Sequence, residues 1–289
     1  MNARRPWYRW LTVASAVLAF VVAFVLIDRS VAWFGVDSHA YWAVDADNPY
    51  TRHAPELDAF LYSPPAVLVA SIFSLLPFDV FVELWRVPLV LAMVAVAGPL
   101  AGVLALTKPL NDELQAGNIN FFMAAVVAFG FRWPALWAFA LLTKVTPGIG
   151  LLWFAVRGEW RSVGIAVGTA LAIALPTVVL FPGLWADWVA LLASQRADPP
   201  GVPLPLTFSF RMVVAVILVV LGARYGRTWT LPFAVVLAHG HIWTGTMAVL
   251  LALIPLLRAG NLPPVKTTAI LPSRRRSTQP DQVASATGS

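Results

Sequence analysis

The sequence predicts an all-α polytopic membrane protein, and three features of its composition lead to this fold class. Hydrophobic residues make up 59% of the 289 residues and charged residues only 12%, whereas soluble domains have roughly 45–50% and about 25%. The mean hydropathy is +0.76. So few polar side chains cannot cover a water-soluble globule of this length, which excludes a cytosolic enzyme.

The absence of cysteine and the distribution of charge exclude further classes. Without Cys, the chain can form no disulfide, thiolate metal site or Cys nucleophile. The formal net charge is +6, but the basic residues are spread over short loops and a tail, with no basic surface interleaved with aromatic residues. We therefore interpret them as signals of membrane topology and predict no nucleic-acid partner.

The first predicted element is a spanning helix from about Trp10 to Ile27. Such a helix needs about 20 mostly apolar residues, and this run follows Arg4, Arg5 and Arg9. The run is too long for a removed signal peptide and lacks a small-residue cleavage site. We expect an uncleaved anchor with its N-terminus inside.

The next stretch, residues 28–63, is predicted to be a large outer loop. It holds 6 of the 14 acidic residues and only two arginines, and loops poor in Lys and Arg lie outside. The acids are Asp28, Asp37, Asp45, Asp47, Glu56 and Asp58.

Seven further apolar runs predict a bundle of about 8–10 transmembrane or re-entrant helices. The turns with Arg157/Arg161 and Arg224/Arg227 are expected in the cytoplasm, and the loop at 185–188 outside. His239-Gly240-His241 interrupts the last run, which predicts two short helices turning on the outer side. The runs are about Pro64–Phe78, Val80–Thr107, Ile119–Phe131, Trp133–Val156, Ser162–Phe181, Leu206–Leu221 and Thr228–Leu257.

Counting crossings leaves two models open. If Trp133–Val156 is one straight helix, Pro64–Phe78 cannot also cross without placing Arg157 outside. We favour a break in Trp133–Val156 at Thr143–Pro147, because Pro removes a backbone donor and a buried Lys needs polar neighbours. In the competing model Pro64–Phe78 is re-entrant and stays outside.

Two regions result from these assignments. Residues 1–259 are predicted to form one polytopic transmembrane domain, with the 28–63 loop as part of it. Residues 260–289, rich in Pro, Ser, Thr, Gln and Arg, are predicted to form a disordered basic tail in the cytoplasm.

Polar residues within an apolar chain are the best candidates for function, because they are costly when unpaired. Asp37, after the first helix, can act as a general base or grip a metal or a hydroxyl; the alternative is a solvated acid that caps a short helix. Asn118 and Asn120 can bind a sugar or join neighbouring helices. Lys144 can bind an anionic phosphate or pair with a loop acid.

Other candidates have weaker signals. Tyr50 and Tyr62 suit the interfacial belt of a membrane protein, and Pro64 or Pro65 suits a helix start. Arg211, near the start of a helix, can snorkel or add charge to a phosphate pocket. The four histidines do not have the spacing of a metal site.

The order of these motifs resembles glycosyltransferase family 87 over roughly residues 10–260. The chain has Gly117-Asn118-Ile119-Asn120 where the family usually has Gly-Gln-x-Asn, an exchange that keeps the amide. The motifs are Asp37 with Tyr41, Pro49-Tyr50, Tyr62 with Pro64-Pro65, Gly117 with Asn118 and Asn120, Lys144 with Pro147, and Arg157-Gly158-Glu159-Trp160-Arg161.

This resemblance implies a C-type glycosyltransferase fold in the plasma membrane with its active site facing outside. It also implies a metal-independent, inverting transfer without a cofactor, from a polyprenol-phosphate sugar to a glycolipid or envelope glycan. The family includes α-mannosyltransferases that use polyprenol-phosphate-mannose, and related arabinofuranosyltransferases. We expect mannose.

The resemblance also implies roles for particular residues. Asp37 is the expected base, with Asp45 and Asp47 as rivals. Lys144, with Arg211, is expected to neutralise the donor phosphate. The residues expected to contact the substrates are His39, Tyr41, Trp42, Tyr50, Tyr62, Asn118 and Asn120.

Two other classes remain as alternatives. In a polyprenol-lipid or solute transporter, Lys144 and the Pro and Gly interruptions would be gating elements, but the sequence shows no pair of matching broken helices. In a non-catalytic membrane scaffold, an Asp37→Ala substitution would be silent.

Overall fold

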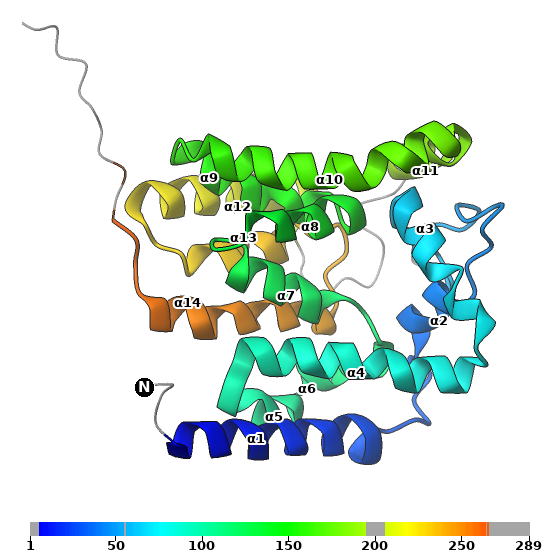
Figure 1. Ribbon diagram of the computed structural model, residues 1–289, viewed down its shortest axis with the longest axis horizontal. Coiled ribbons are helices and arrows are strands. Elements are labelled where there is room, and N and C mark those ends of the chain that lie inside the picture. Colours follow the sequence, from blue (N-terminus) through cyan, green and yellow to red (C-terminus); the bar gives the residue numbers. More distant parts are fainter. Residues whose placement is uncertain (1–5, 55, 195–205, 264, 266–289) are drawn as a thin grey trace, which may run out of the picture.

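The computed structural model describes residues 6–54, 56–194, 206–263 and 265. These residues form helices joined by loops, with no strand among them (Figure 1). The predicted all-α fold class is therefore confirmed. Most of the tail predicted at 260–289 lies outside the described residues.

Four helical segments of the described chain are long and apolar enough to cross a membrane. Several side chains on their outer faces are apolar and exposed; Val25 is 73% exposed and Val179 is 76% exposed. Exposure of such apolar faces to water is unfavourable, whereas contact with lipid is favourable. The segments are α1 (Pro6–Val21) with the π-helical turn η1 (Val22–Leu26), α4 (Phe78–Ala97) with η3 (Gly98–Leu100) and α5 (Ala101–Ala105), α10 (Trp160–Leu180), and α12 (Phe208–Tyr225).

The second of these segments is not one straight helix, although the sequence predicted a single run at Val80–Thr107. Gly98 has φ of +58°, and Pro99 follows it. The turn brings α5 against α1, where the Gly102 N–H donates to Ser15 Oγ at 2.7 Å. A Cβ on Gly102 would lie 2.6 Å from the Ser15 carbonyl oxygen, so this approach requires glycine.

Shorter elements complete the bundle. The predicted interruption at His239–His241 is confirmed, since α13 ends at Leu237 and the next element begins at Thr244. The shorter elements are α2 (Val36–Trp42), α3 (Pro64–Ala70), η2 (Phe73–Leu75), α6 (Lys108–Ala116), α7 (Asn120–Phe129), η4 (Pro134–Leu136), α8 (Trp137–Thr143), η5 (Thr146–Gly150), α9 (Leu151–Val156), α11 (Pro182–Ser194), α13 (Thr230–Leu237), η6 (Thr244–Ala252) and α14 (Leu253–Ala259).

The predicted break in Trp133–Val156 is confirmed. Helix α8 ends at Thr143 and η5 begins at Thr146, with Val145 at φ of +27° between them. The chain then turns back, so that η5 lies beside α8 and α9 lies beside α10 and α12 (Figure 1). However, the full crossing by Pro64–Phe78 that accompanied this model is wrong. Helix α3 has seven residues and its extension ends at Leu75, too short for a bilayer core of about 30 Å.

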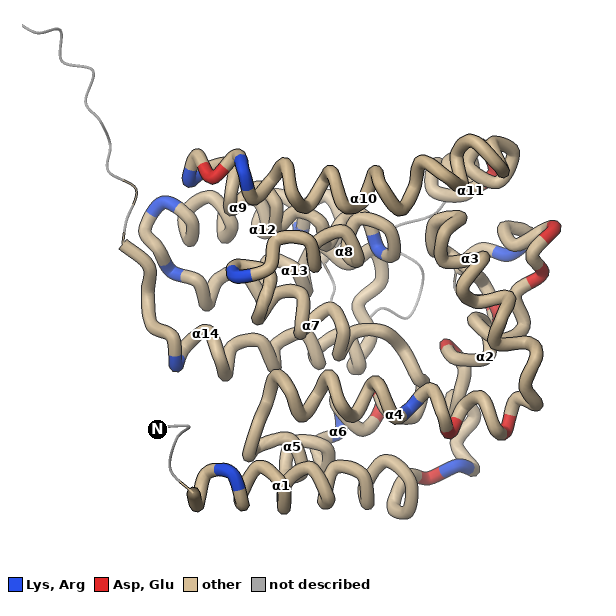
Figure 2. Tube along the Cα trace, viewed as in Figure 1, with Lys and Arg blue, Asp and Glu red and all other residues tan. Residues whose placement is uncertain are grey.

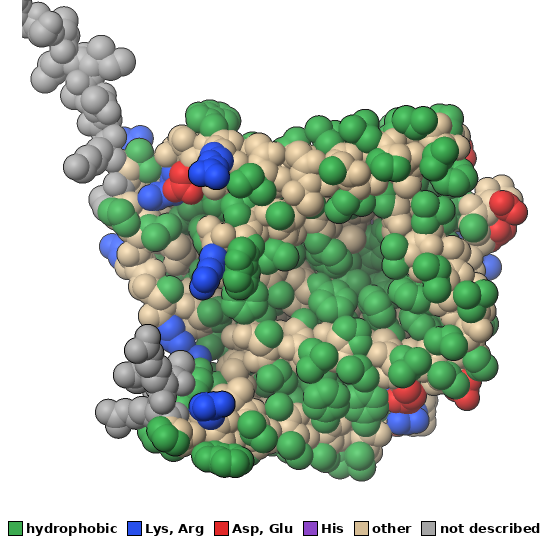
Figure 3. Space-filling view, viewed as in Figure 1, with side chains coloured by type: hydrophobic (Ala, Val, Ile, Leu, Met, Phe, Trp, Pro, Cys, Tyr) green, Lys and Arg blue, Asp and Glu red, His purple; other side chains and the backbone are tan. Residues whose placement is uncertain are grey.

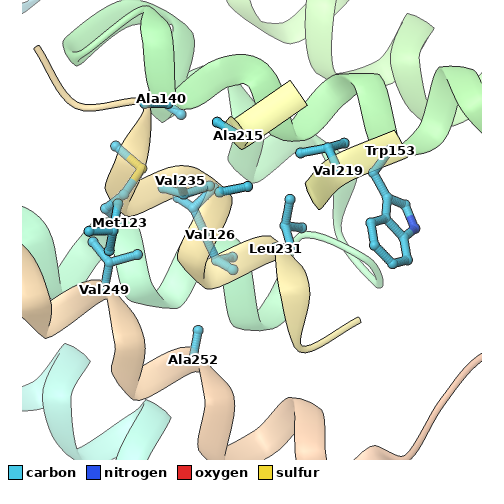
Figure 4. Packing of buried hydrophobic residues seen from close by; sticks show 14 of the residues in the cluster. Met123, Val126, Ala140, Trp153, Ala215, Val219, Leu231, Val235, Val249 and Ala252 are labelled. Atoms are coloured by element: carbon cyan, nitrogen blue, oxygen red, sulfur yellow. The ribbon is translucent and has the colours of Figure 1, made fainter. Parts of the chain in front are cut away.

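The helices pack around an apolar core. Helices α7, α8, α9, α12, α13 and η6 contribute to its largest cluster, which includes Met123, Trp153, Val219 and Val235 (Figure 4). A second cluster joins α1, α4, α6 and α7. Together these clusters fix the ends of α6, α7 and α8, where the polar candidates lie.

Charge divides the bundle into two ends. Acidic residues gather around α2, α3 and α11, whereas Lys and Arg predominate at the end with the N-terminus and α14 (Figure 2). Hydrophobic side chains cover most of the face between these ends, which is hollowed between α10 and α4 (Figure 3).

Candidate functional site

The candidate site lies where the start of α2 meets the end of α6. The Gly35 N–H, at the N-cap of α2, donates to the Gln115 carbonyl at 2.7 Å. Trp33 Nε1 donates to Gln115 Oε1 at 2.6 Å. These two bonds fix the first turn of α2, which carries Asp37, against the last turn of α6.

Gly117 permits the close approach of these two elements. It ends α6 with φ of +74°, a conformation that side chains disfavour. A Cβ at this position would lie 2.8 Å from Ser38 Oγ and 2.9 Å from Ser38 Cβ. Because Gly117 sits directly against α2, the next residue, Asn118, reaches the neighbour of Ser38.

That neighbour is Asp37, which is partly buried. Asn118 Nδ2 donates to Asp37 Oδ2 at 2.9 Å. Among the described residues no donor contacts Asp37 Oδ1. Asp37 therefore does not cap α2, since its carboxylate is turned towards Asn118 with one oxygen free to accept another hydrogen bond.

Lys144 connects the two asparagines. Its ammonium donates to Asn118 Oδ1 at 3.1 Å and to Asn120 Oδ1 at 3.0 Å. No acid of the described chain forms a direct ion pair with Lys144. An ammonium has three donors, so one proton of Lys144 is available to a ligand.

Glu113 completes the cluster, and its contribution was missed from the sequence. Only 1% of this residue is exposed. Its Oε1 accepts from the Asn120 backbone N–H at 2.7 Å and its Oε2 accepts from Asn120 Nδ2 at 2.9 Å. The carboxylate thus turns the Asn120 carbonyl oxygen towards Lys144. Gly245 on η6 leaves the space, because a Cβ there would lie 2.5 Å from Glu113 Oε2.

We call these five residues the amide–lysine cluster: Asp37, Glu113, Asn118, Asn120 and Lys144. They come from α2, α6, the link between α6 and α7, the start of α7 and the break after α8. Four of them were predicted as site residues, and the structure brings all four together. The break that ends α8 places the Lys144 ammonium among groups that can accept its hydrogen bonds.

A row of tyrosines continues from this cluster. Asp37 and Tyr41 are four residues apart on α2 and so lie on one face of it. The Tyr41 and Tyr62 hydroxyls lie 2.9 Å apart, and Tyr50 OH donates to the Tyr62 carbonyl at 2.9 Å. Burial and the nearby Asp37 charge raise the pKa of Tyr62 above its usual value, so this hydroxyl stays protonated.

His39 and Trp42 have partners outside the cluster. His39 Nδ1 contacts Asp58 Oδ1, and Arg52 contacts the other oxygen of Asp58 at 3.0 Å. Trp42 Nε1 donates to the Leu76 carbonyl at 2.7 Å. Both rings also pack on Phe78. Their predicted contacts with substrate remain predictions.

Arg211 is fully buried and binds backbone. It donates to the carbonyls of His239 at 2.6 Å and Gly240 at 3.0 Å, just beyond α13. It donates also to the carbonyl of Leu237 at 3.2 Å. These bonds satisfy carbonyls at the end of a helix, and a phosphate-binding role for Arg211 stays a prediction.

The two rivals for the base lie outside the cluster. Asp45 and Asp47 are exposed, and Asp45 Oδ1 accepts from the Asp47 N–H at 3.0 Å. Burial raises the pKa of Asp37 above its usual 3.8, opposed by the charge of Lys144 and the Asn118 hydrogen bond. A carboxylate with a raised pKa is a better proton acceptor, so Asp37 suits this role better than either rival.

Comparison with known proteins gives one result. The family described as Glycosyltransferase family 87 matches residues 60–273, which covers α3 to α14 and includes four of the five members of the amide–lysine cluster. Asp37 precedes the matched range. No curated protein and no solved structure matches the chain.

Proposed function

The chain belongs to glycosyltransferase family 87, and from this premise we propose that it transfers a sugar from a polyprenol-phosphate donor to a glycolipid or envelope glycan. The observation that carries the proposal is the pair of hydrogen bonds by which Asn118 joins Asp37 to Lys144. It holds a proton acceptor and a positive charge at opposite ends of one amide.

The proposed reaction uses these two ends separately. Asp37 Oδ1 takes the proton of the acceptor hydroxyl as the oxygen forms a bond to the anomeric carbon. The bond from this carbon to the phosphate oxygen breaks, and its electron pair leaves with the lipid phosphate. Lys144 neutralises the charge that grows there. Direct displacement of this kind inverts the anomeric configuration, and Lys144 supplies the charge without a metal ion.

The surroundings of the site support a lipid-linked donor. The long helices expose apolar side chains, and the hollow between α10 and α4 is lined by hydrophobic residues (Figure 3). A prenyl chain is compatible with such a surface. The excess of Lys and Arg at the opposite end supports an outward-facing site in the plasma membrane (Figure 2).

Transfer of radiolabelled mannose from polyprenol-phosphate-mannose to membrane glycolipids tests the proposal. We expect Asp37→Asn, which keeps the size and removes the charge, to lower transfer by roughly 10²–10⁴-fold. Asp45→Asn and Asp47→Asn, in the exposed loop, should transfer normally. Equal transfer by wild type and Asp37→Asn would exclude Asp37 as the base.

Polyprenol-phosphate-arabinose, assayed in parallel, tests the choice of sugar. Mannose is preferred only on the family resemblance, and transfer of arabinose alone would replace it. A wild-type protein that transfers neither sugar would contradict the proposal and favour a transporter or a scaffold.

Lys144→Met tests the phosphate contact separately. Met keeps the length of the side chain and removes the ammonium, so polyprenol phosphate without a sugar should bind at least about tenfold more weakly. Unchanged binding of polyprenol phosphate would exclude Lys144 as the phosphate ligand.

A further inference from the structure

A polar cleft lies between the first outer loop and α11. It has a volume of about 430 Å³, within the roughly 300–1,000 Å³ of small-molecule sites. Residues 48–51 and His53 form one wall, and four residues of α11 form the other: Asp187, Ala190, Leu191 and Ser194. Neither wall has been assigned a role so far, apart from Tyr50.

The two walls are held together although they are far apart in the sequence. His53 Nε2 lies 3.0 Å from Ser194 Oγ. Near one end of the cleft, Trp188 Nε1 donates to the Leu61 carbonyl at 3.1 Å. The cleft is therefore formed by defined contacts between the loop and α11.

The lining of the cleft suits a neutral ligand with many hydroxyl groups. It offers an amide, two hydroxyls, an imidazole, a phenol ring and a carboxylate, from Asn48, Thr51, Ser194, His53, Tyr50 and Asp187. These groups can accept and donate hydrogen bonds in turn. The lining contains neither Lys nor Arg, so it does not favour a phosphate. A saccharide matches this chemistry.

The cleft is also connected to the reacting end of the cluster. Tyr50 belongs to its lining and donates to the Tyr62 carbonyl, Tyr62 contacts Tyr41, and Tyr41 shares a face of α2 with Asp37. The path from the cleft to the base therefore has two hydrogen-bonded steps and one helical turn. These contacts tie the loop wall of the cleft to the helix that carries Asp37.

We propose that the cleft binds the saccharide of the acceptor, one or more units away from the hydroxyl that reacts. That this saccharide is the acceptor rests on the proposed function. Saccharide binding by the cleft does not depend on catalysis. It assigns Asp187 as the carboxylate that accepts hydrogen bonds from sugar hydroxyls.

Ligand-observed NMR with the purified full-length protein in detergent tests the binding. The probes are two neutral disaccharides, α-mannobiose and an arabinofuranosyl disaccharide. We expect one of them to bind wild type and Asp37→Asn alike, and Asp187→Asn about tenfold more weakly. No binding of either disaccharide to wild type would overturn the inference, as would equal binding by Asp187→Asn.

A steric variant controls for effects of the charge that Asp187→Asn removes. Ala190 lines the cleft, whereas Val189 is exposed on the same helix outside its lining. Ala190→Trp should abolish disaccharide binding and Val189→Trp should not. Binding retained by Ala190→Trp would contradict the cleft as the site.

Kinetics then separate this inference from the proposed function. In the transfer assay, Asp187→Asn should raise the acceptor KM about tenfold and leave kcat at saturating acceptor unchanged. If disaccharides bind but wild type transfers no sugar, the proposed function fails and the saccharide site stands. If transfer occurs and Asp187→Asn changes kcat alone, the acceptor site fails.

Discussion

Glu113 acts on the site through another residue. Its two oxygens accept both donors that Asn120 can turn towards it, and this fixes which atom of the Asn120 amide meets Lys144. An amide that rotated by half a turn would present donors to an ammonium. The buried carboxylate therefore determines the polarity of the cluster without contacting either proposed substrate.

Glu113→Gln tests this positioning role. The new amide can accept only one of the two bonds from Asn120 and presents a donor to the other, so Asn120 should lose its fixed orientation. We expect a donor KM raised about threefold to tenfold with a smaller change in kcat. Glu113→Asp, which keeps the charge, should raise the donor KM less than Glu113→Gln does. A lower yield of folded protein with unchanged KM would mean that Glu113 is only structural.

The pH dependence of transfer follows from Asp37. The base must be deprotonated, and burial raises its pKa above 3.8. Activity should therefore decline, as pH falls, at a higher pH than an ordinary Asp would produce. A profile of kcat/KM against pH measures this acid limb. The residual activity of Asp37→Asn should lack the limb, and its persistence there would assign it to another group.

Most of the cluster could be predicted from single residues, and the exceptions have physical reasons. Asp37, Asn118, Asn120 and Lys144 stand out because polar groups are rare in an apolar chain. The role of Glu113 depends on a turn that brings residue 120 back over residue 113, and the sequence does not reveal that return. An Arg that binds carbonyls, such as Arg211, has the same sequence pattern as one that binds a ligand.

At the scale of elements, the site depends on one close contact between α2 and the end of α6. The contact at Gly117 combines a positive φ with a distance that excludes a Cβ. It is the means by which Asn118 reaches Asp37 across 81 residues of sequence.

Gly117→Ala should separate these two elements. The strained φ costs about 1–2 kcal/mol, and the overlap with Ser38 adds to it. We expect a lower melting temperature and a loss of transfer larger than the loss of folded protein. Gly168→Ala is the matched control, because Gly168 on α10 has open space around its Cβ position. Wild-type transfer by Gly117→Ala would show that the contact does not position Asn118.

Element boundaries were predictable where a polar residue marked them. The break after α8 was predicted because Lys144 and Pro147 coincide there, and the interruption before η6 because His239–His241 is polar. The turn at Gly98 was missed because it lies within an apolar run, where length alone suggests one continuous helix. The shortness of α3 was left open, because one of the two models had Pro64–Phe78 cross fully and the other had it re-entrant.

For the whole molecule, apolar length and charge predicted the helical bundle but not its packing. Contacts such as α7 with η6 or α12 with α9 join apolar faces that are alike in composition. The distribution of charge predicts an orientation in the membrane, because acidic and basic residues gather at opposite ends of the bundle (Figure 2).

Cysteine labelling tests this orientation, since the sequence has no native Cys. Ala46 lies exposed in the acidic loop between α2 and α3, and Ala259 lies exposed at the end of α14. In intact cells, a membrane-impermeant thiol reagent should label Ala46→Cys but label Ala259→Cys only after permeabilisation. The reverse pattern would place the amide–lysine cluster on the cytoplasmic side.

The position of Lys144 in the chain has a consequence for biosynthesis. Its two amide partners, Asn118 and Asn120, and the acids behind them, Asp37 and Glu113, all precede it in the sequence. The ribosome therefore delivers every partner before the ammonium itself. When the segment with Lys144 leaves the translocon, all of its hydrogen-bond partners have already been synthesised. The ammonium can therefore be paired as it enters the membrane, where an unpaired charge is costly.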